Sequence, residues 1–243
     1  MGAEALAARL AAGAPQISVG ILTADLGHLA DELARLEAAG VGVVHTDVMD
    51  GVFCPMLTVG EPFVRAQRTP LLKDVHLMVD EPLEKVAAFA RAGADMLTFQ
   101  VESARNPHRV LQTIGGLANE NDPSRGILRG LAISPGTPLE VLPPLLDELD
   151  YVMLLAINPG WGGQKFSTAT GSRVARVRDL VRASGRPIPV GIDGGVTKAN
   201  IRGVGALGAD LVVTGSAVFD GTPDVEANAR HMLEELRAGA AGG

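Results

Sequence analysis

One turn recurs three times along the chain, each time between the end of a predicted helix and an apolar segment. It reads AAGVGVVHT at 38–46, RAGADMLTF at 91–99 and ALGADLVVT at 206–214. In each copy a glycine stands where a helix ends, because glycine readily adopts the left-handed backbone found there. A chain that repeats helix, tight turn and strand builds parallel strands joined by helices. The repeat therefore predicts an α/β fold with these turns on one face.

Eight apolar segments are predicted to be strands, and helical segments separate them. The predicted strands cover residues 16–22, 43–47, 73–78, 95–100, 127–133, 151–157, 188–192 and 211–214. The predicted helices cover residues 25–39, 62–67, 82–92, 107–118, 138–149, 172–184, 198–206 and 224–237. Eight such units in 243 residues predict a single (β/α)8 TIM barrel, a fold of about 250 residues. The alternative is a doubly wound open sheet, which usually has a glycine-rich turn after its first strand; this chain has GILTADL there.

The barrel is expected to occupy most of the chain, at residues 16–237. Residues 1–15 are rich in alanine and are expected to form a helical extension, whereas residues 238–243 are expected to be a flexible tail. The segment NENDPS at 119–124 is expected to be a solvated loop without a chemical role.

Charge and composition argue against several classes of function. A formal net charge of -7 leaves no basic field to neutralise nucleic-acid phosphates, so nucleic acid is not an expected partner. No apolar run approaches the roughly 20 residues of a membrane helix, and the N-terminal segment lacks the apolar centre of a signal peptide, so no membrane association is expected. Cys54 is the only cysteine and cannot form an intrachain disulfide, which fits a cytoplasmic location.

Polar side chains collect at the predicted strand ends where barrel enzymes carry their chemistry. His45 and Asp47 lie two residues apart, so their side chains point the same way from a strand. With His76 and Asp193 they could hold one divalent cation, although each taken alone also fits a structural role at the barrel rim. The four together favour the metal site. Zn²⁺ is the expected ion, and Fe²⁺, Mn²⁺ or Co²⁺ would also fit.

Three glycine-containing turns follow the last three predicted strands: NPGWGGQ at 158–164, DGG at 193–195 and GS at 215–216. Backbone N–H groups in such turns can converge on an anion, and barrels commonly bind phosphate after strands seven and eight. The alternative is that glycine merely permits tight turns. Three such turns on adjacent strands favour a phosphate site and hence a small phosphorylated substrate.

Six segments resemble, in order, the motifs of the ribulose-phosphate 3-epimerase family: ILTADL, HTDVMDGVFCP, DVHLMV, INPGWGGQKF, IDGGV and GSAVF. The resemblance implies an epimerase of the pentose phosphate pathway that converts D-ribulose 5-phosphate to D-xylulose 5-phosphate through an enediolate. It implies that His45, Asp47, His76 and Asp193 bind the metal, and that the two aspartates are also the acid/base pair. It further implies that the chain forms a homo-oligomer.

The resemblance also assigns the substrate contacts. The residues implied to hold the phosphate are Gly160, Trp161, Gly162, Gly163, Gly194, Gly195, Gly215 and Ser216. Met49 and Met78 are implied to cover the sugar, and Gly20 lines the substrate site where the family usually has serine.

Four residues, Gly20, Met56, Gln100 and Leu155, depart from the family pattern around the substrate. A 3-epimerase for another ketose phosphate, such as D-allulose 6-phosphate, is therefore an alternative. A non-catalytic phosphosugar-binding barrel is another, although it would have no need for both Asp47 and Asp193. A Schiff-base aldolase is disfavoured, because only Lys165 lies in a loop on the catalytic side.

Overall fold

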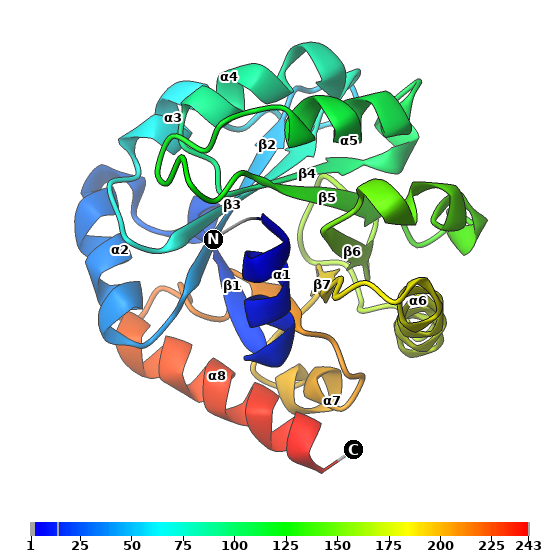
Figure 1. Ribbon diagram of the computed structural model, residues 1–243. Coiled ribbons are helices and arrows are strands. Elements are labelled where there is room, and N and C mark those ends of the chain that lie inside the picture. The colour runs from blue at the N-terminus through cyan, green and yellow to red at the C-terminus, as the bar shows by residue number, and fades with distance from the viewer. Residues whose placement is uncertain (1–2, 14, 243) are drawn as a thin grey trace.

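The computed structural model describes residues 3–13 and 15–242, and within them eight parallel strands close into a barrel in chain order (Figure 1). The strands are β1 (Gln16–Gly20), β2 (Val43–Met49), β3 (Leu72–Met78), β4 (Met96–Gln100), β5 (Leu128–Ile133), β6 (Tyr151–Leu155), β7 (Val190–Asp193) and β8 (Leu211–Thr214). β8 pairs with β1 and closes the barrel, so the predicted single (β/α)8 barrel is confirmed.

The helices surround the strands, except for α1. The α-helices of the described residues are α1 (Ala3–Ala12), α2 (Leu29–Ala38), α3 (Glu61–Ala66), α4 (Val86–Arg91), α5 (Pro107–Gly115), α6 (Thr170–Ser184), α7 (Ile201–Gly205) and α8 (Val225–Ala241). Short 3₁₀ helices are η1 (Ile21–Thr23), η2 (Leu26–His28), η3 (Pro82–Glu84), η4 (Val101–Ser103), η5 (Leu139–Val141) and η6 (Pro143–Glu148). In the part of the chain that the structure describes, no helix combines the length and the apolar character needed to cross a bilayer.

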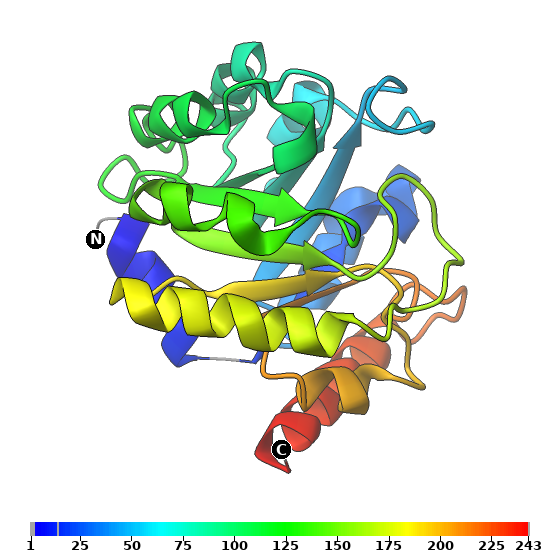
Figure 2. The same cartoon turned by 90° about the vertical axis from the view of Figure 1, so that its right-hand side faces the viewer.

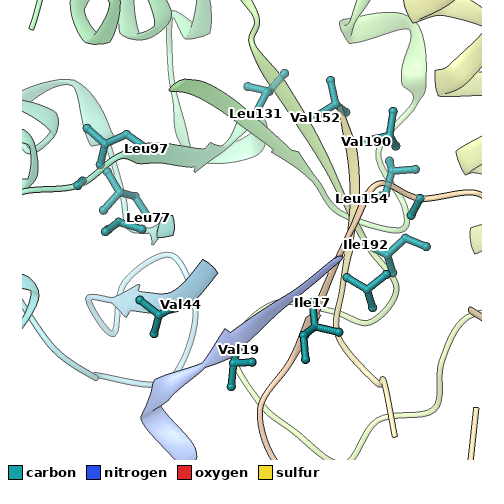
Figure 3. Close-up of a cluster of buried hydrophobic side chains, with 14 of the residues drawn as sticks. Ile17, Val19, Val44, Leu77, Leu97, Leu131, Val152, Leu154, Val190 and Ile192 are labelled. Carbon is teal, nitrogen blue, oxygen red and sulfur yellow. The ribbon is translucent and has the colours of Figure 1, made fainter. Parts of the chain in front are cut away.

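Alternate side chains of each strand enter two different cores, as the two-residue period of a strand requires. One set faces outward and packs against the surrounding helices; Ile17, Val44 and Ile192 belong to it (Figure 3). The other set faces inward and includes Val43 and Tyr151. Both sets are apolar through most of their length, which explains why the strands read as almost continuous apolar runs.

Helix α1 closes the N-terminal end of the barrel. Its buried residues Leu6, Ala7 and Leu10 join the inward-facing core, whereas the long loops after β2 and β6 lie at the opposite end (Figure 2). The predicted N-terminal helix is therefore present, and its apolar face packs into the barrel. This leaves the C-terminal end as the open end.

Replacing Leu6 by alanine is expected to lower the free energy of unfolding by about 2–5 kcal/mol, because it leaves a cavity in the barrel core. Leu6 is 1% exposed, whereas Leu57, in the loop after β2, is 79% exposed. Urea unfolding of Leu6→Ala beside Leu57→Ala measures the effect, and the control should change stability by less than about 0.5 kcal/mol. Equal effects of the two variants would contradict the packing of α1 into the barrel.

The segment between β5 and β6 does not form the α-helix predicted at 138–149. It consists of η5 and η6, with Leu145 N–H donating to the Leu142 carbonyl at 2.8 Å in the three-residue spacing of a 3₁₀ helix. Pro143 and Pro144 lack the N–H groups that an α-helix needs beyond its first turn, so the tighter winding prevails.

Two further sequence expectations differ from the structure. Asn119, expected in a solvated loop, is completely buried, and its amide donates to Asp95 Oδ1 at 3.1 Å and to the Gly126 carbonyl at 2.8 Å. Helix α8 continues to Ala241, through most of the segment expected to be a flexible tail, because Gly239 lets α8 approach α7 closely: a Cβ there would lie 1.9 Å from the Arg202 carbonyl oxygen.

Candidate active site

A cavity of about 480 Å³ opens at the C-terminal end of the strands. Its walls come from the ends of β2, β3, β6, β7 and β8 and from the loops that follow β1, β2 and β6. This is the end of the barrel opposite α1 (Figure 2). Asp47 and Asp193 both line the cavity. The cavity is thus where the sequence predicted chemistry to lie.

The four predicted metal ligands meet beside this cavity. His45 and Asp47 point inward from β2, and Asp47 pairs in register with His76 of β3. Asp193 is the last residue of β7. One donor atom from each of the four lies within 4.8 Å of those of the others, so they form a possible divalent metal site.

Asp47 is at the centre of this group. Its Oδ1 lies 3.1 Å from His45 Nε2 and 3.0 Å from His76 Nδ1, and His76 Nδ1 lies 3.7 Å from Asp193 Oδ2. Both imidazole rings are completely buried, whereas the two carboxylates remain partly exposed to the cavity. Two imidazole nitrogens and two carboxylates suit Zn²⁺, Fe²⁺, Mn²⁺ or Co²⁺, so the residues fit a divalent ion without selecting one.

Asp74 supports the site and was missed in the sequence. This buried carboxylate lies 2.7 Å from His45 Nδ1, and Ser18 Oγ donates to the same Asp74 oxygen at 3.3 Å. A carboxylate on Nδ1 fixes the ring and directs Nε2 toward the possible metal position. The available signal was spacing: Asp74 precedes His76 by two residues in one strand, so both side chains face the barrel interior.

Asp74→Asn is expected to weaken metal binding about 10- to 100-fold, because His45 loses the carboxylate that orients it. Competition with a chromophoric chelator measures the affinity for Zn²⁺. Asp31→Asn, an exposed change on α2, is the matched control and should leave that affinity unchanged. Unaltered affinity in Asp74→Asn would show that the His45–Asp74 contact does not support the metal site.

The charged groups of the site influence one another strongly. Burial would lower the pKa of His45, but the Asp47 and Asp74 carboxylates outweigh burial and hold it well above its usual value. Burial would raise the pKa of Asp47, but His45 and His76 lower it well below the ordinary range. Burial, aided by Asp47, raises the pKa of Asp193 to about 6. The two carboxylates therefore differ in how readily they hold a proton.

The glycine turns form the wall of the cavity beside β7 and β8. Of the predicted phosphate contacts, Gly163 alone does not line the cavity; those that do are Gly160, Trp161, Gly162, Gly194, Gly195, Gly215 and Ser216. Gly194 has a φ of 96°, and a Cβ there would lie 2.3 Å from Ile157 Cγ1, so this turn requires glycine. No lysine or arginine lines this cavity among the described residues. An anion held there would depend on backbone N–H groups.

The positions that depart from the family pattern separate into two groups. Gly20, Met56 and Leu155 line the cavity, as do the predicted lining residues Met49 and Met78. Gln100 does not: it is completely buried, and its amide donates to Ser134 Oγ at 3.3 Å. The three lining positions are therefore placed to affect which ligand fits the cavity, whereas Gln100 supports the neighbouring loop.

Comparison with solved structures identifies the fold. Tryptophan synthase from Mycobacterium tuberculosis aligns with a TM-score of 0.64 and 18% identity, covering 98% of both chains. KGPDC from Streptococcus mutans aligns with a TM-score of 0.63 and 13% identity, covering 92% of this chain and 97% of the other. At these identities the likeness concerns the barrel alone.

Comparison of sequences identifies the family. A profile of the "Ribulose-phosphate 3 epimerase family" matches residues 16–219. The chain is 40% identical to "Ribulose-phosphate 3-epimerase 1" of Cupriavidus necator, covering 93% of this chain and 92% of that protein. It is 38% identical to "Ribulose-phosphate 3-epimerase" of Bacillus subtilis, covering 91% of this chain and 98% of that protein. The cavity with its possible metal site thus belongs to an isomerase, and the chain is a member of the ribulose-phosphate 3-epimerase family.

Proposed function

We propose that this protein is a metal-dependent epimerase that inverts C3 of D-ribulose 5-phosphate to give D-xylulose 5-phosphate. The observation that carries the proposal is the placement of Asp47 and Asp193. They come from β2 and β7, line one cavity and share it with glycine turns suited to a phosphate. Inverting a carbon requires an acid and a base on its two faces, and these carboxylates can supply both.

In the proposed reaction, one aspartate removes the C3 proton and the other returns a proton to the opposite face. For the forward direction one carboxyl must begin protonated and the other ionised, and the two exchange these states during the step. A divalent ion held by His45, Asp47, His76 and Asp193 would supply positive charge against the ketone oxygen as it becomes negative. His45 is held in place for that task by Asp74.

The distal end of the substrate is proposed to lie against the glycine turns. Gly194, Gly195 and Gly215 bring their backbone close to the cavity, and Ser216 lies beside them. N–H groups at such turns bind the oxygens of a phosphate without a cationic side chain. Met49 and Met78 are proposed to pack against the sugar between this end and the metal site.

A 3-epimerase acting on D-allulose 6-phosphate is the second candidate. It is favoured by the small Gly20 and by the apolar Met56 and Leu155, all of which line the cavity. Both candidates use the same acid/base pair, so they differ in the preferred sugar and not in the chemistry.

Proton NMR in D₂O tests the proposal directly. With metal-loaded protein, the C3 hydrogen of D-ribulose 5-phosphate should be replaced by deuterium while D-xylulose 5-phosphate forms, and chelation should abolish both. Reaction of D-allulose 6-phosphate alone would move the assignment to the second candidate. No reaction of either sugar with metal-loaded protein would contradict both and leave a phosphosugar-binding barrel.

Gly20→Ser is expected to lower the KM for D-ribulose 5-phosphate by about 2- to 10-fold, because the hydroxyl adds one hydrogen bond to a polar substrate. The side chain can be accommodated, since a Cβ at this position would lie 3.4 Å from its nearest neighbour, the Gly215 Cα. Gly20→Ala adds the same Cβ without the hydroxyl and is the matched control. Steady-state kinetics of both variants with both sugars measure the effect; equal KM values for the two variants would exclude a role for the hydroxyl.

A further inference from the structure

A second cavity, of about 280 Å³, lies at the N-terminal end of the barrel and shares no lining residue with the catalytic cavity. It is formed by the start of β3, the C-terminal ends of α3 and α4, and the loop that contains Asn121. Four cationic side chains line it: Arg65, Arg68, Lys73 and Arg91. We call it the basic cavity. Glu120 is the one acidic residue in its described lining.

None of these four cations forms an ion pair within the described residues; Lys73 is buried, whereas the three arginines are exposed. Lys73 is only 5% exposed, and its ammonium donates to the Val64 carbonyl at 3.3 Å; among residues 3–13 and 15–242 no carboxylate forms an ion pair with it. By contrast, Arg129 donates to both Asp150 and Glu148 at 2.7 Å. The side chains of Arg65, Arg68 and Arg91 likewise have no ion pair or hydrogen bond to another described residue. The cavity therefore gathers four cations beside one acidic lining residue, in a chain whose net charge is -7.

Helix ends explain only part of this arrangement. Arg65 and Arg91 stand in the last turns of α3 and α4, where the carbonyl ends of helices favour cations. Lys73 is different, because it belongs to β3 and is buried: burial lowers the pKa of its ammonium, and the Asp95 carboxylate nearby offsets only part of that effect. Gly93 leaves room for the ammonium: a Cβ there would lie 3.2 Å from Lys73 Nζ. Among the described residues, the cavity thus has a buried donor without an ion-pair contact, with three arginines at its exposed side.

We infer that the basic cavity is a binding site for a small phosphate monoester or inorganic phosphate, distinct from the catalytic site. Three guanidinium groups offer paired N–H donors that match phosphate oxygens, and the Lys73 ammonium adds a buried point charge. A volume of about 280 Å³ is close to the lower bound, about 300 Å³, of ordinary small-molecule sites, so the occupant is small. A dianionic group would offset half of the charge of the four cations.

Amide NMR of the ¹⁵N-labelled, zinc-loaded full-length protein tests this inference with inorganic phosphate at low ionic strength. Binding in the basic cavity should shift the amides of Gln67, Gly93 and Asn121, separately from those of Gly194 and Gly215 in the catalytic cavity. Lys73→Met and Arg68→Gln should each weaken the phosphate affinity of the basic cavity about tenfold or more, because each removes a charged hydrogen-bond donor. The shifts of the catalytic-cavity amides and the KM for D-ribulose 5-phosphate should stay unchanged in both variants.

The catalytic-cavity response shows in the same spectra that each variant is folded, so the outcome remains interpretable. Arg109→Gln, which changes an exposed arginine outside both cavities, is the matched control. The inference is overturned if phosphate does not shift the amides of Gln67, Gly93 and Asn121 in the unmodified protein. It is also overturned if Lys73→Met and Arg68→Gln show the same shifts of these amides as the unmodified protein. Glucose 6-phosphate and AMP are compared with inorganic phosphate. Tighter binding of either ester identifies an organic monoester as the ligand, whereas weaker binding identifies free phosphate, and both rankings support the site.

Discussion

Asp193→Asn is expected to lower the epimerisation rate of D-ribulose 5-phosphate by about 10²- to 10⁴-fold, because it removes one member of the proposed acid/base pair and keeps the size of the side chain. Asp47 remains and can still remove the C3 proton from one face. In D₂O the variant should therefore exchange the C3 hydrogen of only one of the two epimers, without inversion. The proton NMR assay described above, started from each epimer in turn, measures both rates.

Two controls separate acid/base chemistry from metal binding. The zinc content of Asp193→Asn shows whether the ion is still held, and Asp80→Asn changes an exposed carboxylate at the same end of the barrel. Full epimerase activity in Asp193→Asn would refute the proposed mechanism. Loss of exchange from both epimers together with loss of zinc would assign Asp193 to metal binding rather than to proton transfer.

Gly191→Ala is expected to lower the free energy of unfolding by about 3 kcal/mol, a large part of the about 5–15 kcal/mol that keeps a protein folded. Gly191 lies in β7 and faces the barrel interior, where a Cβ would lie 1.9 Å from Tyr151 Oη and 2.7 Å from its Cζ. The Tyr151 ring is completely buried and cannot move aside without displacing its neighbours. Urea unfolding of the variant measures the loss.

A double-mutant cycle identifies the cause of that loss. Tyr151→Leu removes the ring, so Gly191→Ala should cost much less in its presence, and the difference is the coupling energy of the pair. Gly203→Ala is the control for adding a methyl group, because a Cβ at Gly203 in α7 would have no neighbour within 4 Å. A loss that is the same with and without Tyr151 would show that the clash does not determine stability.

Most of the barrel was predictable because its strands are buried on both faces and read as apolar runs. The glycine turns before β2, β4 and β8 marked where helices end. The α-helix predicted at 138–149 was wrong because apolar spacing alone suits a helix there, whereas Pro143 and Pro144 lack the N–H groups that an α-helix needs. The prediction that Asn119 is solvated was wrong for a different reason. Its partner Asp95 is distant in the sequence, and no local pattern indicates such a contact.

The four possible metal ligands were predictable because polar side chains at strand ends stand out in an apolar sequence. Asp74 was not recognised, because its role depends on register: it lies opposite His45 in the β2–β3 pair. Gln100 was expected near the substrate because it ends β4, yet its side chain turns to Ser134 of the neighbouring loop. The basic cavity was not predictable from the sequence, because its cations come from three separate segments that only the fold brings together.

Helix α1 has a consequence for how the chain reaches its folded state. It is synthesised before the strands, yet the core that it enters contains side chains from β2, β3, β4, β5, β6 and β8, including Leu211. During synthesis its apolar face therefore has no complete partner until nearly the whole chain has emerged, and β1 must likewise wait for β8. Pairing the start of the chain with its end is slow because a long loop must close first. Docking of α1 is thus a late step of folding, because α1 can dock fully only after the barrel has closed.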